Sequence, residues 1–63
     1  NIMPLHKINT ICRRTSLDRL RQIREKLAVA LLAGALEGTN VRACLRLVER
    51  EIARRELVAL FKD

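Results

Sequence analysis

The sequence has almost no aromatic side chains: Phe61 is the single one among 63 residues, and Trp and Tyr are absent. Proteins that bind single-stranded nucleic acid stack its bases on aromatic rings, and helices that lie on membranes use Trp or Phe as anchors. The sequence disfavours both modes. The longest uncharged stretch in the middle of the chain is residues 27–36, about half of the ~20 apolar residues that a membrane-spanning helix needs. We therefore expect no membrane span.

Cysteine and histidine are also scarce. Cys12 and Cys44 form no Cys-x-x-Cys motif, and His6 has no second histidine to pair with. We therefore predict no disulfide staple, no metal site and no cofactor, and an intracellular, reducing compartment, cytoplasmic or nuclear. Cys12 precedes two arginines, which can lower the pKa of a thiol, but we expect an incidental exposed thiol there and not a functional one. No phosphate loop, nucleophile elbow or pocketed acid–base pair is present, so we predict that the chain is not an enzyme.

Glycine and proline occur three times in all, at Pro4, Gly34 and Gly38, which leaves room for long helices. Apolar residues recur three or four apart from Leu17 to Leu36 and again from Val41 to about residue 62, the spacing of amphipathic helices. A hydroxyl cap at residues 15–16 begins the first helix, and Gly38 is expected to end it. We predict an all-α fold in which residues 16–63 form a helical hairpin. Residues 1–15 form either a short helix or a basic arm that orders on contact.

Each predicted helix carries more apolar surface than one antiparallel neighbour can cover. Two sets point away from the hairpin interface and need the N-terminal segment or a second copy of the chain. We therefore predict a homodimer packed as a four-helix bundle. The expected interface residues are Val29, Leu32, Leu36, Leu57, Leu60 and Phe61.

The charge is strongly basic. Thirteen Lys and Arg against seven Asp and Glu give a net charge of +6, and ten of the basic residues are Arg. Such a surplus attracts polyanions, and guanidinium groups bind phosphate or carboxylate in a bidentate manner. Four arginines at four-residue spacing form one ridge about 18 Å long on the second helix. The predicted nucleic-acid-binding residues are Lys7, Arg13, Arg14, Arg42, Arg46, Arg50 and Arg54.

Residues 30–49 resemble a helix-turn-helix of the Fis or repressor type. Gly34, Gly38, Val41, Cys44 and Leu47 occupy the small, turn and core positions of that twenty-residue pattern. Glu37 and Leu45 depart from it. The resemblance implies that the helix beginning near Val41 enters the major groove of DNA with Arg42 and Arg46 nearest the bases.

Two shorter resemblances point elsewhere. Residues 48–54 (VEREIAR) are similar to the second helix of the small helical-hairpin protein of the bacterial large ribosomal subunit. Residues 13–17 (RRTSL) resemble the recognition pattern of basophilic protein kinases, which implies phosphorylation of Ser16. A phosphate there would lie at a helix N-terminus beside two guanidinium groups.

Two functional hypotheses follow, and they predict different surfaces. In the first, the chain is a nucleic-acid-associated regulator that binds phosphates as a homodimer through its basic residues. In the second, it is an assembly module that binds a helical or acidic protein partner through its apolar faces.

Overall fold

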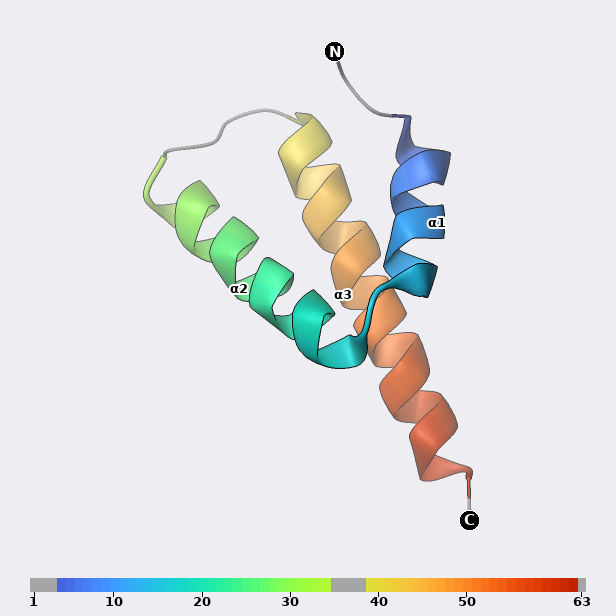
Figure 1. The fold of residues 1–63 in the computed structure, drawn as a ribbon. Coiled ribbons are helices and arrows are strands. Elements are labelled where there is room, and N and C mark those ends of the chain that lie inside the picture. The colour runs from blue at the N-terminus through green and yellow to red at the C-terminus, as the bar shows by residue number, and fades with distance from the viewer. Residues whose placement is uncertain (1–3, 35–38, 63) are drawn as a thin grey trace.

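The computed structural model describes residues 4–34 and 39–62, which form three helices: α1 (Leu5–Arg14), α2 (Leu17–Leu32) and α3 (Thr39–Leu60). The predicted all-α class is confirmed. In Figure 1, α2 runs antiparallel to α3, whereas α1 runs in the same direction as α3. Both pack against α3, which is therefore the element shared by the two pairs. The α2–α3 pair is the predicted hairpin, and α1 is an additional helix along its side.

The N-terminal segment is helical rather than an unstructured arm. Pro4 precedes the first turn of α1, and its carbonyl accepts hydrogen bonds from the backbone N–H groups of Lys7 and Ile8. At the other end, Thr15 and Ser16 have extended backbones, which separates α1 from α2 by a two-residue corner. This short corner brings the end of α1 next to the start of α2.

The start of α2 is capped as predicted. The Ser16 hydroxyl oxygen accepts a hydrogen bond from the backbone N–H of Arg19 at 3.2 Å. Asp18 lies in the first turn, where its negative charge interacts favourably with the helix dipole. The cap satisfies one of the otherwise unpaired N–H groups of the helix end.

The predicted extension of this helix to Leu36 is wrong, because α2 ends at Leu32. Gly34 has a φ of +72°, and its N–H donates to the carbonyl of Leu31, as in a glycine-terminated helix. The first glycine thus ends the helix, and the prediction that Gly38 does so lies outside the described residues. The helix-turn-helix resemblance fails for the same reason, since its pattern needs Gly34 inside a helix.

The core lies where all three helices meet. Cys12, Leu20, Val48 and Ile52 are each between 1% and 4% exposed, and they come from α1, α2 and α3. Four half-buried apolar residues pack around them: Ile8, Leu17, Ile23 and Leu27. The core is small, which is typical of a chain of this length. It is also a three-helix core, so the likeness to a two-helix ribosomal protein does not extend to the fold.

The C-terminal end of α3 extends beyond α1 and α2 (Figure 1). Leu57, Val58, Leu60 and Phe61 are all more than half exposed there. The chain has a radius of gyration of 12.5 Å, whereas a compact chain of this length has about 10.6 Å. Of the two alternatives for covering the second apolar face of α3, the N-terminal segment does not supply the cover at the end of the helix, because α1 packs beside the core and reaches Arg55. The alternative of a second copy stays a prediction.

Candidate functional site

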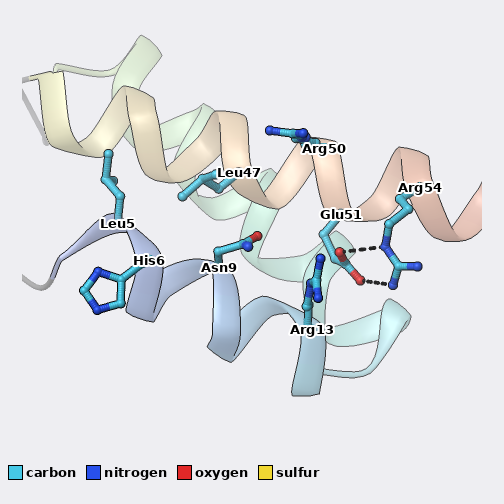
Figure 2. Close-up of a pocket in the computed structure, with 8 residues that line it drawn as sticks. All are labelled: Leu5, His6, Asn9, Arg13, Leu47, Arg50, Glu51 and Arg54. Atoms are coloured by element: carbon cyan, nitrogen blue, oxygen red, sulfur yellow. Dashed lines mark hydrogen bonds and ion pairs between the residues drawn. The ribbon is translucent and has the colours of Figure 1, made fainter.

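A groove runs between α1 and α3 and encloses a cavity of about 450 Å³ (Figure 2). Polar and basic side chains from both helices line most of it, and two leucines line the rest. We call it the α1–α3 groove. Its lining residues are Leu5, His6, Asn9, Arg13, Leu47, Arg50, Glu51 and Arg54.

One wall of the groove is a buried carboxylate held by two arginines. Glu51 is 3% exposed. Arg54 donates from Nε to Oε1 at 3.0 Å and from Nη2 to Oε2 at 2.7 Å, and Arg55 donates from Nε to Oε2 at 2.8 Å. The hydrogen bonds from Arg54 lower the pKa of Glu51 to about 2, against the opposing effect of burial. Glu51 is therefore ionised and fully paired.

Arg55 also fixes the end of α1. Its Nη2 donates to the backbone carbonyls of Cys12 at 2.7 Å and of Arg13 at 3.0 Å. These carbonyls lie in the last turn of α1, where a cation is favoured by the helix dipole. Glu51 and Arg55 thus join α1 to α3 and set where Arg13 projects. This role was not predicted from the sequence, although the i,i+4 spacing of Glu51 and Arg55 is a signal for an ion pair.

The structure brings part of the predicted basic set together. Arg13 from α1 and Arg50 and Arg54 from α3 line the same groove. Arg54 is paired with Glu51, whereas the salt bridges among the described residues involve neither Arg13 nor Arg50. All four arginines of the predicted ridge are exposed, and the fourth, Arg54, differs in being paired with Glu51.

The remaining predicted basic residues are exposed but do not line the groove. Arg42 and Arg46 are exposed on the outward side of α3 and, at a helical repeat of 3.6 residues, lie in one row with Arg50. Lys7 and Arg14 are exposed on α1. Asn9 and His6 line the groove and were not predicted as binding residues. Only the packing of α1 on α3 reveals them.

The predicted interface residues that the structure describes are all exposed in the single chain. Val29, Leu32, Leu57, Leu60 and Phe61 are more than half exposed, and Leu36 lies outside the described residues. Val58 is equally exposed and was not predicted. On α3 the row of Arg42, Arg46 and Arg50 leads, along the same side of the helix, to Leu57 and Leu60. The outward face of α3 is thus basic in its first half and apolar at its end.

The two cysteines are free, and Cys12 is not the exposed thiol that its sequence neighbours indicated. It is buried in the core, and burial raises the pKa of its thiol. The charge that opposes this rise is that of Arg55 on α3 and not that of the two arginines that follow Cys12. Cys44 is half-buried.

Ser16 is exposed, and its hydroxyl caps α2. Within residues 4–34 and 39–62, no group of three or more His, Cys, Asp or Glu side chains is placed to hold a metal ion. Over the same residues, no helix combines the length and apolar character that crossing a membrane requires.

Comparison with protein-family models, with curated proteins and with solved structures gives no match for this chain.

Proposed function

We propose that this chain is a small basic binding module that contacts the phosphates of nucleic acid and acts as a homodimeric regulator. The observation that supports this function best is the α1–α3 groove. It joins Arg13, from the basic N-terminal segment, to Arg50, from the arginine ridge. Two basic regions that are 37 positions apart in the sequence therefore form one continuous surface.

The energetics of the ridge favour an anionic partner. Like charges at four-residue spacing repel each other along a helix. Glu51 offsets the charge of Arg54, but no described acidic side chain forms a salt bridge with Arg42, Arg46 or Arg50. A phosphate backbone would neutralise this row and release condensed counterions from the nucleic acid. Guanidinium groups also suit phosphate geometry, because they donate two parallel hydrogen bonds.

The test is a fluorescence-anisotropy titration with labelled duplex DNA and duplex RNA at several salt concentrations. We expect binding that weakens steeply with salt, because several phosphates are contacted. Arg13→Gln and Arg50→Gln should each weaken binding about 10-fold and reduce the salt slope by about 1. Arg19→Gln is the matched control, since Arg19 is equally exposed but lies on α2, and it should change affinity less than about two-fold.

Two results would contradict the proposal. One is the absence of salt-dependent binding by the wild-type chain at low salt. The other is an equal loss of affinity for the Arg19 control, which would mean that net charge alone attracts the polyanion. Reversal of Arg42, Arg46 and Arg50 to Glu should abolish binding and leave dimer formation intact.

A second candidate function is protein assembly, and the exposed end of α3 favours it. Large apolar side chains that are more than half exposed are typical of surfaces that bind another helix. In this case Leu32→Asp should abolish complex formation, whereas charge reversal on the ridge should have a smaller effect. The two functions are distinguished by which of these variants loses its complex.

A further inference from the structure

Two apolar surfaces are left uncovered by the residues that the structure describes. The first, which we call the tail, is the end of α3 with Leu57, Val58, Leu60 and Phe61 exposed by 53–82%. The second, which we call the α2 hollow, is a shallow depression of about 660 Å³ on the outer side of α2. Its lining is mostly apolar and consists of Gln22, Glu25, Lys26, Val29, Ala30 and Ala33. Leu32, 90% exposed, lies next to it on the same helix.

The tail and the α2 hollow cannot meet within one chain. Because α2 runs antiparallel to α3, the C-terminal turns of α2 lie near the start of α3, and the tail is at the other end of the molecule (Figure 1). The longest dimension of the chain is 41 Å. Any contact between the two surfaces must therefore join two different copies.

The amount of uncovered surface matches what a dimer needs. The accessible surface of the chain is 5197 Å², whereas a compact monomer of this mass has about 4100 Å². The tail, Val29 and Leu32 together expose on the order of 600 Å² of apolar side chain, taking about 150 Å² for each fully exposed large residue. With the polar rim added, this approaches the ~800 Å² that each partner contributes to a stable interface.

We propose that the tail of each copy packs into the α2 hollow of the other copy, in an antiparallel dimer with two-fold symmetry. This inference rests on the homodimer of the proposed function and names the surfaces that form it. Lys62 directly follows the tail, and the hollow is lined by both Glu25 and Lys26, so the contact that suits Lys62 is an ion pair with Glu25. The antiparallel arrangement also places the two arginine ridges at opposite ends of the dimer, which reduces repulsion between two chains of net charge +6.

The two-fold arrangement makes a distinctive prediction for mixtures. A tail variant (Leu60→Gln/Phe61→Gln) keeps its hollow, and a hollow variant (Val29→Gln/Leu32→Gln) keeps its tail. Either variant alone has no intact contact in its own dimer, so sedimentation equilibrium should show mainly monomer, with the dissociation constant of the dimer raised at least 100-fold. An equimolar mixture has one intact contact per heterodimer, so mixing should restore dimers. Ile11→Gln, at a half-exposed apolar position on α1, is the matched control and should leave the dimer unchanged.

A second measurement uses the wild-type chain and depends on no variant. A zero-length carbodiimide reagent should join Lys62 of one copy to Glu25 of the other, detected by mass spectrometry in a mixture of light and isotope-labelled chains.

Several results would overturn the proposal. A wild-type chain that is monomeric at high micromolar concentration would do so. So would a hollow variant that still dimerises, because the interface would then be tail to tail. The reciprocal contact would also be excluded if mixing the two variants did not restore dimers, provided that circular dichroism confirms the helical content of both. Anisotropy with duplex DNA, recorded on the same samples, shows separately whether nucleic-acid binding fails.

Discussion

The middle of α3 and its C-terminal end both carry large apolar side chains, but these side chains have opposite environments. In the middle of the helix, Val48 and Ile52 are almost fully buried between α1 and α2. Two turns later, Leu60 and Phe61 are at least 80% exposed. The difference arises from where the other helices turn. The corner at residues 15–16 lies opposite the middle of α3, so neither α1 nor α2 covers the end of the helix.

This comparison teaches that helical spacing of apolar residues does not identify what covers them. The same pattern occurs on a face that the chain buries itself and on a face that it leaves open. The distribution of charged residues distinguishes the middle of α3 from its end better than the apolar spacing does. The middle of α3 contains Glu51 with Arg54 and Arg55, a network that is worth forming only where α1 is present to share it. The tail, residues 57–61, contains no charged side chain at all.

The largest expected effect comes from the buried half. Ile52→Ala removes a side chain that is 1% exposed and leaves a cavity where all three helices meet. We expect a loss of about 2–5 kcal/mol in the free energy of unfolding, which is a large part of the stability of a chain this small. Urea denaturation followed by circular dichroism at 222 nm measures it. A midpoint within error of wild type would mean that the two halves of α3 do not differ in this way.

Replacing the buried carboxylate should have the next largest effect. Glu51→Gln keeps the shape of the side chain but removes the charge that pairs Arg54 and Arg55. We expect a loss of about 1–3 kcal/mol, because charge-assisted hydrogen bonds at a buried site are replaced by weaker ones. Glu49→Gln on the exposed side of the same helix is the control and should stay within about 0.5 kcal/mol.

Low pH should reduce the stability of the fold by protonating Glu51 in the middle of α3. The pKa of Glu51 is lowered from 4.5 to about 2 in the folded chain, so the unfolded chain binds the proton first as the pH falls. The stabilising contribution is therefore fully present above about pH 4.5 and is lost progressively toward about pH 2. Urea midpoints measured across this range should fall for the wild type. The Glu51→Gln variant should show a shallower dependence, by about one proton, and an identical dependence would contradict the assignment.

The sequence predicted the fold well where local signals were unambiguous. Ser16 and Asp18 marked the start of α2 correctly, because capping depends on residues that are adjacent in the sequence. The predicted end of α2 was wrong because Gly34 and Gly38 can each terminate a helix, and the apolar residues between them favoured Gly38. The buried state of Cys12 was also missed, since it depends on the packing of α1 and not on its arginine neighbours.

The residue types of the candidate site could be predicted from the sequence, whereas the spatial arrangement of these residues could not. The exposed arginines of α3 could be identified from their four-residue spacing alone. That Arg54 belongs to the fold, and that Arg13 shares a groove with Arg50, follows from the contact of two helices distant in the sequence. Long-range contacts of this kind leave no periodic signal in a single sequence.

The smallest expected effect is at the tail, and it sharpens the comparison most. Leu60→Ser removes a large apolar side chain, yet at dilutions where the chain is monomeric we expect a change within about 0.5 kcal/mol, because Leu60 is 80% exposed. At higher concentrations the wild type and the variant should diverge. A dimer makes the thermal midpoint rise with concentration, since association stabilises only the folded chain. The midpoint of Leu60→Ser should be nearly independent of concentration. A large loss of stability in the dilute variant would instead show that the tail is buried within its own chain.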